Sequence, residues 1–181
     1  MRSAGFSAAD VERWIPRLRR YALALTGQRD AADDLVQDAL ERAWRKRALW
    51  QPGSDLRAWL FTVMHNVHVN RVRASHPTEG LDELRADERG AHSAPPGPSG
   101  ETRVMVSELG HALMRLSDEQ REVVLLIGLE QMTYAEAAAV IEVPVGTVMS
   151  RLSRGREKLR LMLADAGQPV AGGGASLRRV K

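Results

Sequence analysis

Apolar residues recur at intervals of three and four along almost the whole chain, and this spacing constrains the fold more than any other feature. An α-helix with 3.6 residues per turn places such positions on one face. Three apolar stripes cover the first half of the chain, over residues 11–25, 32–43 and 56–67. We find no convincing alternation of apolar and polar residues, which would mark a half-buried strand. The sequence therefore predicts an all-α protein.

A stretch rich in glycine, proline and serine divides the chain. It reads GAHSAPPGPSG over residues 90–100, where eight of eleven residues are of these three types. Such a composition cannot bury enough apolar surface to offset the entropy lost on ordering. We therefore expect two small helical domains joined by a flexible linker. The expected boundaries are 1–76 for the first domain, 77–103 for the linker, 104–165 for the second domain and 166–181 for a disordered tail.

Helix-start signals organise the second half. Ser117 with Gln120, and Thr133 with Glu136, have the spacing of a capping box, in which two side chains satisfy free amides at a helix start. They predict helices over 118–129 and 134–141. A third helix is expected from residue 144 to about 163, because proline suits the first helical position, where its missing N–H would have no partner.

This third helix has two unlike faces. On a helical wheel the apolar side comprises Val145, Val148, Leu152, Leu159 and Leu163. The opposite side comprises Thr147, Ser150, Arg151, Arg154 and Lys158. Residues 145–160 contain five cations and one acid, a net charge of +4. Gly146 leaves the first turn without a side chain, so that its free amides can approach a phosphate closely.

A helix, a tight turn and a second helix with a cationic outer face are the arrangement of a helix-turn-helix domain that reads the major groove of DNA. A cationic face is also commonly just a solvated one, and helix pairs with tight turns are common in bundles. From these residues alone, DNA reading and a plain helical bundle remain equal alternatives.

Two successive helices in the first half have opposite character. Five acids and no cation occur between residues 30 and 41, at Asp30, Asp33, Asp34, Asp38 and Glu41. Acids are favoured at a helix start, but this preference does not reach Asp38 or Glu41. An acidic helix repels DNA and suits a basic protein partner.

The next helix, over 56–73, lies in a segment without acids that contains three arginines with aromatic and amide residues between them. Such residues suit unstacked single-stranded bases. Trp59 lies in the apolar stripe and is expected in the core, whereas Phe61 lies off its centre and is the better stacking candidate. His65 and His68 are three apart, but without cysteine or a nearby carboxylate we expect them near phosphate or exposed rather than on a metal.

Both halves resemble one family. TYAEAAAVIEVPVGTVMSRLSRGREKLR resembles the promoter-reading C-terminal domain of bacterial sigma factors of the extracytoplasmic-function group. DAADDLVQDALERAWRKRALWQPGSDLRAWLFTVMHNVHVNRVR resembles the promoter-melting N-terminal domain of the same group. The resemblance implies an alternative sigma factor that binds core RNA polymerase, recognises the minus-35 and minus-10 promoter elements and opens the DNA. It also implies an anti-sigma factor as a regulatory partner.

The resemblance assigns three sets of residues. Duplex minus-35 contacts are expected from Gly146, Thr147, Met149, Ser150, Arg151, Ser153, Arg154 and Lys158. Single-stranded minus-10 contacts are expected from Trp59, Phe61, Asn66, Asn70, Arg71 and Arg73, helped by the loop over 50–54. Polymerase contacts are expected from Asp34, Leu35, Gln37, Asp38, Glu41 and Trp44.

Two residues depart from the pattern of the family. Met149 stands where a basic residue is common, and it cannot donate a hydrogen bond to a base. Glu142 stands at a turn position that glycine commonly occupies.

The composition limits other functions. The chain has no cysteine, which excludes disulfides and thiolate metal sites. No stretch approaches the roughly 18 apolar residues that span a bilayer, so we expect a soluble cytoplasmic protein without membrane insertion. We find no Gly-rich phosphate loop or nucleophile elbow, so no enzyme activity, cofactor or metal is expected.

Two other functions compete with the sigma-factor interpretation. One is a helix-turn-helix regulator that acts without polymerase, which the acidic helix and the acid-free aromatic helix disfavour. The other is a sigma mimic that only sequesters an anti-sigma factor, which the intact DNA-facing residues Ser150, Arg151 and Arg154 disfavour.

Overall fold

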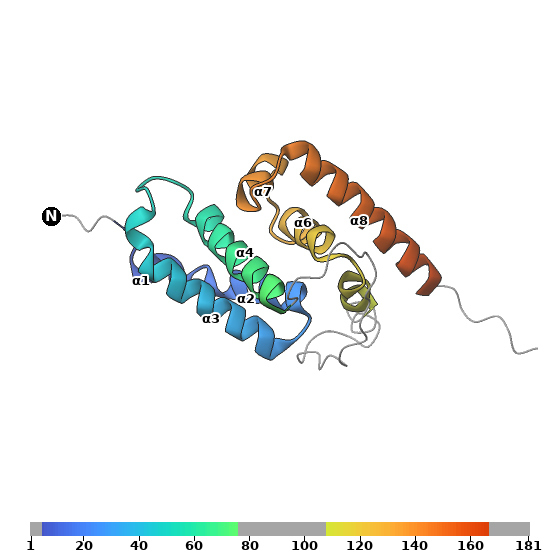
Figure 1. Ribbon diagram of the computed structural model, residues 1–181, viewed down its shortest axis with the longest axis horizontal. Helices are drawn as coiled ribbons and strands as arrows, with labels where there is room; N and C mark the ends of the chain where they lie inside the picture. Colours follow the sequence, from blue (N-terminus) through green and yellow to red (C-terminus); the bar gives the residue numbers. More distant parts are fainter. Residues whose placement is uncertain (1–4, 76–107, 167–181) are drawn as a thin grey trace, which may run out of the picture.

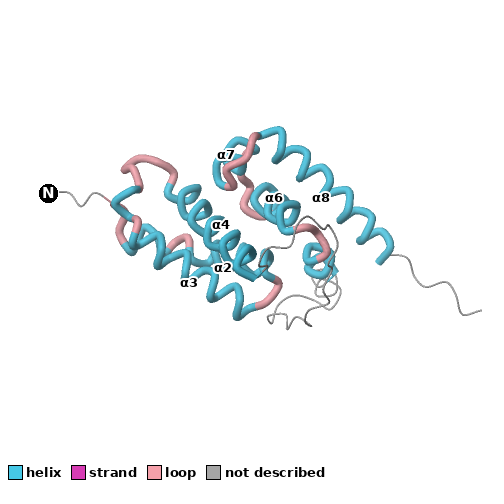
Figure 2. Tube along the Cα trace, in the orientation of Figure 1, coloured by secondary structure: helices cyan, strands magenta, loops and turns pink. Residues whose placement is uncertain are grey.

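The computed structural model describes residues 5–75 and 108–166, and the regular elements in these ranges are all helical (Figure 1 and Figure 2). The N-terminal domain contains α1 (Ala8–Glu12), α2 (Ile15–Thr26), α3 (Arg29–Arg45), a 3-10 turn η1 (Arg47–Leu49) and α4 (Leu56–Ser75). The C-terminal domain contains a helical segment over 108–114, α6 (Asp118–Gly128), α7 (Tyr134–Val140) and α8 (Val145–Ala166). Two all-α domains are therefore confirmed. The expected linker and nearly all of the expected tail lie outside the described residues, and the exact boundaries stay predictions.

The first apolar stripe forms two helices rather than the single helix that its spacing suggests. α1 ends at Glu12, and α2 begins at Ile15 with Pro16 in its first turn. Ser7 and Asp10 form a full capping box on α1, in which each side chain accepts a hydrogen bond from the other residue's backbone N–H. α2 ends at Gly27, whose φ of 72° is the left-handed conformation that glycine adopts without steric cost.

α4 lies in the middle of the molecule. It contacts α3 on one side and α7 of the C-terminal domain on the other, and α2 contacts α6 (Figure 1). The side chains of Leu60, Met64 and Val67 enter the core, and no residue between Leu56 and Val69 is exposed. A surface helix usually keeps one wide polar face in water. α4 is instead enclosed on most of its circumference.

The C-terminal domain is a small bundle of α6, α7 and α8. α6 and α7 end within one residue of the positions that the sequence predicts. Thr133 and Glu136 form a full capping box on α7. Ser117 caps α6 by accepting from the backbone N–H of Gln120, but the return bond is not made, and the Gln120 Oε1 is buried without a hydrogen-bond partner among the described residues.

Gly155 sets the distance at which α8 crosses α6. It is buried, and a Cβ at this position would lie 2.9 Å from Val124 Cγ2 and 3.5 Å from the Gln120 carbonyl oxygen. A methyl group cannot be accommodated there unless Val124 moves. The glycine in the middle of α8 therefore has a steric reason, although glycine lowers helix propensity.

Candidate nucleic-acid and polymerase surfaces

The turn between α7 and α8 is tight and contains one strained residue. Glu142 has a φ of 55°, the left-handed conformation that glycine tolerates best. The turn is closed by the N–H of Val143, which donates to the Ala138 carbonyl at 3.1 Å, and by the N–H of Thr147, which donates to the Pro144 carbonyl at 2.9 Å. The helix-turn-helix geometry is thus formed with glutamate at the position where the family commonly has glycine.

The faces of α8 largely match the helical wheel. Val148, Leu152 and Leu159 are buried, and Leu163 is half-buried. The expected place of Val145 on the apolar side is wrong, because its side chain lies at the exposed first turn of α8. The exposed side of the helix includes most of the residues assigned to minus-35 contacts, namely Gly146, Met149, Ser150, Ser153, Arg154 and Lys158.

The remaining minus-35 candidates, Thr147 and Arg151, are partly buried by other residues of the domain. The guanidinium of Arg151 pairs with Glu119 of α6 at 2.9 Å, and its side chain is mostly covered. Thr147 is half-buried, and its carbonyl accepts the Ser150 hydroxyl at 3.0 Å. At Gly146, by contrast, an added Cβ would have no heavy atom within 4 Å. The first turn of α8 is therefore bare on the side where a phosphate could approach.

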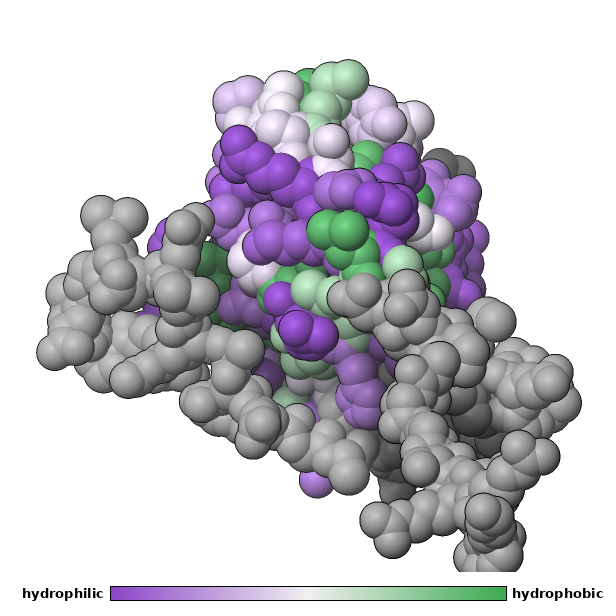
Figure 3. Space-filling model, turned by 90° about the vertical axis from the view of Figure 1, so that its right-hand side faces the viewer, coloured by the Kyte–Doolittle hydropathy of each residue, from purple (hydrophilic) through white to green (hydrophobic). Residues whose placement is uncertain are grey.

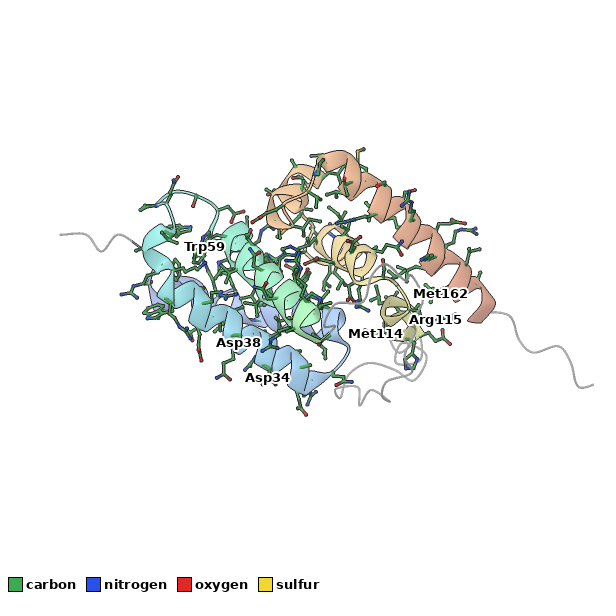
Figure 4. All side chains as sticks on the ribbon, in the orientation of Figure 1. Asp34, Asp38, Trp59, Met114, Arg115 and Met162 are labelled. Carbon is green, nitrogen blue, oxygen red and sulfur yellow. The ribbon has the colours of Figure 1, made fainter. Side chains whose placement is uncertain are left out.

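The acidic face of α3 lies on the side of α4 that faces away from the C-terminal domain (Figure 4). Asp34, Gln37, Asp38, Glu41 and Trp44 are all exposed. Leu35 is fully buried, so its assignment to the polymerase surface is wrong. It belongs to the core because it follows the apolar stripe of α3.

Two of the acids assigned to the polymerase surface have cationic partners. Asp38 pairs with Arg71 of α4 at 2.5 Å, and Glu41 pairs with Arg45 one turn further along α3 at 2.9 Å. Both pairs are exposed, so solvent screens them strongly. They leave the acidic surface available to a competing cationic partner.

α4 presents fewer of its residues than the sequence suggests. Phe61 is only 1% exposed, and its ring meets Tyr21 edge-on at 5.1 Å. The expectation that Phe61 is available for stacking is therefore wrong for this arrangement, because α2 supplies an aromatic partner that the stripe alone does not reveal. Trp59 is half-buried and packs against the core, as expected.

The polar minus-10 candidates on α4 differ in availability. Asn66 donates to the Thr62 carbonyl at 3.1 Å and is half-buried. Asn70 and Arg73 are exposed near the C-terminal end of the helix. Arg71 donates to the Asp34 carbonyl at 3.0 Å in addition to pairing with Asp38.

The two histidines of α4 are covered rather than exposed. His65 Nδ1 lies 2.7 Å from Glu122 Oε1 of α6. His68 Nε2 is buried without a hydrogen-bond partner among the described residues, and burial lowers the pKa of its imidazole. The expectation of exposed histidines is wrong because the C-terminal domain lies against α4. No group of three or more potential metal ligands occurs within residues 5–75 and 108–166.

An aromatic cluster beside the loop before α4 was not predicted. The ring of Phe6 lies 6.3 Å from Trp44, 5.9 Å from Trp50 and 5.3 Å from Trp59. A depression next to it is lined by Phe6, Trp14, Trp50 and loop residues up to Leu56, and the indole N–H groups of Trp14 and Trp50 are buried without partners among the described residues. Phe6 precedes every periodic element, so helical spacing could not reveal it.

The rest of the visible surface is mainly polar. The end of the molecule at the right of Figure 1 is mostly hydrophilic where described residues are visible, with small separate apolar areas (Figure 3). None of the helices in the described ranges is long and apolar enough to cross a membrane.

Comparison with known proteins agrees with this two-domain architecture. Residues 11–65 match a family model described as the sigma2 domain of PhyR, and residues 107–159 match the model of sigma-70 region 4. The ECF RNA polymerase sigma factor EcfG of Rhodopseudomonas palustris (strain TIE-1) is 35% identical over 171 residues, which cover 94% of this chain and 92% of EcfG.

Two solved structures are similar along most of the chain. The sigma factor RpoE of Bartonella quintana, solved with the anti-sigma factor NepR, has a TM-score of 0.68 and 32% identity, covering 86% of this chain and 95% of that one. CnrH, solved with the cytosolic domain of CnrY, has a TM-score of 0.64 and 27% identity, with 88% of both chains covered.

The helical domains and their paired matches define a sigma-factor architecture, with a region 2 domain followed by a region 4 domain. The chain belongs to the ECF RNA polymerase sigma factors, as its identity to EcfG over nearly the full length of both proteins shows. It is therefore an alternative sigma factor, a protein that binds core RNA polymerase and directs promoter-specific initiation. This membership decides against a regulator that acts without polymerase.

Proposed function

We propose that the chain performs its sigma-factor role through three separate surfaces. The exposed acidic face of α3 binds core polymerase, α4 with the loop before it binds the minus-10 strand, and the outer face of α8 reads the minus-35 duplex. The observation that carries this proposal is the separation of charge. The acids of α3 and the cations Arg154 and Lys158 of α8 are exposed on different domains.

The outer face of α8 suits a duplex reader. Arg154 is exposed and has the fork of donors that pairs with a guanine edge in the major groove. The pair between Arg151 and Glu119 fixes the rotation of α8 on α6, so Arg151 positions the recognition helix. Met149 and Tyr134 line one shallow depression, and we propose that Met149 contacts a base through its apolar side chain.

The acidic face of α3 suits a basic protein surface. Asp34 and Asp38 are one turn apart and exposed, and Trp44 two turns further is 46% exposed. Carboxylates steer a cationic partner, and an exposed tryptophan is a frequent anchor at interfaces. The chain itself needs no catalytic group for this role, because it positions the polymerase and the DNA.

A binding assay with core RNA polymerase tests the assignment of α3. We expect Asp34→Lys with Asp38→Lys to weaken binding at least about tenfold, since reversing close charges costs several kcal/mol. Glu12→Lys is the matched control, because Glu12 is an exposed acid on α1 outside the proposed surface. Equal binding of both variants to polymerase would rule out the acidic face.

We further propose that an anti-sigma protein controls this chain. The support is similarity to two sigma factors solved with NepR and with the cytosolic domain of CnrY. We expect that co-expression with an anti-sigma factor of the NepR type that binds the chain lowers transcription from a dependent promoter. Unchanged transcription, with both proteins shown to be present, would contradict this control.

A further inference from the structure

Ion pairs between charges of opposite sign cross the contact between the two domains. The cations all come from the N-terminal domain, where Arg17 and Arg20 lie on α2 and Arg57 on α4. The acids all come from the C-terminal domain, where Glu130 follows α6 and Glu136 lies on α7. An interface between domains that stay together is usually large and apolar, whereas a polar one is typical of domains that move relative to one another.

Glu130 is the centre of this contact. Its side chain is 0% exposed, with Oε2 at 3.0 Å from Arg17 Nε and Oε1 at 3.1 Å from Arg20 Nη2. Its backbone carbonyl accepts from Arg17 at 3.3 Å and from Arg57 at 3.4 Å. A buried carboxylate without a partner is costly, so this arrangement requires the arginines of the other domain.

Two further acids extend the contact along α4. Arg57 Nη2 lies 3.2 Å from Glu136 Oε1, and His65 Nδ1 lies 2.7 Å from Glu122 Oε1. The Tyr21 hydroxyl donates to the same Glu122 oxygen at 3.5 Å. This row of acids runs beside the stretch of α4 in which no residue between Leu56 and Val69 is exposed.

We infer that the C-terminal domain acts as an intramolecular stand-in for DNA. In the closed chain the carboxylates of Glu130 and Glu136 pair with Arg17, Arg20 and Arg57, and the C-terminal domain covers α4. When the domains separate, the same arginines contact the phosphate backbone of the promoter. The guanidinium group pairs with a carboxylate and with a phosphate through the same fork of donors, which allows the exchange.

The inference rests on the proposed role of α4. It assigns Arg17, Arg20 and Arg57 as additional contacts to the phosphate backbone of the DNA. It also accounts for the enclosure of a helix that has to meet single-stranded DNA. Because the closed chain presents little of α4, its apparent affinity for a single strand is reduced in proportion to the open fraction.

Fluorescence energy transfer in the full chain measures closure. The sequence contains no cysteine, so labels go only to Ser54→Cys and Ala135→Cys. Both positions are exposed and flank the contact between Arg57 and Glu136, so the labels lie close together when the domains are closed. We expect high transfer in the otherwise unchanged chain, and a loss of transfer with Glu130→Gln or with Arg17→Gln plus Arg20→Gln.

Arg19→Gln is the matched control. Arg19 lies on the same helix but pairs with Asp33 of α3, so its loss leaves the contact between the domains intact. Transfer that stays high in the Glu130 and the arginine variants would overturn the closed arrangement. The two sets of substitutions lie in different domains, so a folding defect in one, seen by circular dichroism, leaves the other as a test.

Binding of an oligo(dT) single strand to the unlabelled full chain distinguishes the two parts of the inference. One is that the C-terminal domain covers α4, and the other is that the arginines contact phosphates. We expect Glu130→Gln to raise the affinity at least about fivefold, because it opens the chain and leaves the arginines free. Arg17→Gln with Arg20→Gln also opens the chain, but it is expected to bind no better than the original. Its salt slope should be about 1.4 units lower than that of Glu130→Gln, since each phosphate contact to a single strand contributes about 0.7.

Each other result has a definite meaning. If Glu130→Gln opens the chain without raising the affinity, the C-terminal domain does not cover the single-strand surface. If the double arginine variant binds as tightly as Glu130→Gln, these arginines do not contact phosphates. Promoter-dependent transcription by the original chain with core polymerase is measured in parallel, and its absence would refute the proposed function rather than the closure.

Discussion

Arg154 and Lys158 lie one turn apart on the exposed side of α8, and they are expected to make different contacts. Arg154→Ala should cost about 1–3 kcal/mol and relax the preference at one base pair, as the loss of a bidentate base contact does. Lys158→Ala should weaken all sequences alike and lower the salt slope by about one unit. The measurement is binding to a minus-35 duplex and its single-base variants over a salt series. An equal loss for every duplex with Arg154→Ala would make Arg154 a phosphate contact.

His68 gives the stability of the protein a predictable pH dependence. Burial lowers the pKa of His68 in the folded state, although the nearby acids Glu122 and Asp118 oppose this shift. The unfolded chain therefore binds more protons as the pH falls below the ordinary histidine pKa, and the free energy of unfolding decreases on acidification. The buried neutral imidazole therefore makes its full contribution to stability above the ordinary histidine pKa, and this contribution is lost as the pH falls below it.

Chemical denaturation at about pH 7.5 and pH 5.5, on either side of the ordinary histidine pKa, tests this prediction. We expect His68→Gln to lose less stability than the original chain between these two values. His65 is unchanged in both proteins, so its pair with Glu122 cancels in the comparison. A steeper pH dependence in the variant would contradict a buried, neutral His68.

At the scale of elements, the crossing of α6 and α8 depends on Gly155. Gly155→Ala places a methyl group 2.9 Å from Val124 Cγ2, and valine has little rotamer freedom with which to move away. We expect a loss of about 1–2 kcal/mol in the free energy of unfolding, because overpacking outweighs the gain in helix propensity. Thermal or denaturant unfolding of the full chain measures this loss.

Gly146→Ala is the matched control on the same helix. An added Cβ there has open space, so the fold should be unaffected or slightly stabilised, by up to about 1 kcal/mol. Its effect should appear in minus-35 binding instead, since the methyl group stands where the bare first turn is expected to approach a phosphate. Equal stabilities of the two variants would mean that α8 does not cross α6 at this distance.

The helices were predictable because their signals are local. Capping pairs, Pro144 and apolar spacing placed α6, α7 and the start of α8 within one residue. The break between α1 and α2 was missed because apolar spacing continues through Trp14 and Ile15, even though Pro16 marks a helix start. Phe61 was misplaced because a wheel for one helix does not include the ring of Tyr21 that a second helix brings to it.

At the scale of the whole molecule, sequence patterns predict which residues form the charged surfaces but not how the two domains are arranged relative to one another. The acids of α3 and the cations of α8 follow from composition, and apart from Arg151 they are exposed as expected. The row of contacts from Glu130 to Arg17 and Arg20 joins residues more than 100 positions apart, and no local pattern indicates such a pair. The enclosure of α4 and of its two histidines follows from this arrangement, which is why those expectations were wrong.

In the molecule as a whole, the face that we propose for polymerase is open, while the helix that we propose for the minus-10 strand is covered. Asp34 and Asp38 remain accessible in the closed chain, whereas α4 is enclosed (Figure 4). Binding to polymerase is therefore expected to come first and opening second. With Glu130→Gln, the opening of the domains should no longer limit the rate of transcription initiation.

Run-off transcription with core RNA polymerase tests the central claim most directly. The template carries a promoter selected from genomic DNA by the polymerase reconstituted with this chain, and the chain is added, omitted or replaced by the variant Asp34→Lys with Asp38→Lys. We expect a discrete transcript with the original chain, none when the chain is omitted, and a yield reduced at least about tenfold with the variant, in line with the loss of close charge pairs. The Glu12→Lys control should support the original yield. Initiation at that promoter by core polymerase alone, at the same level as with the chain, would contradict the account.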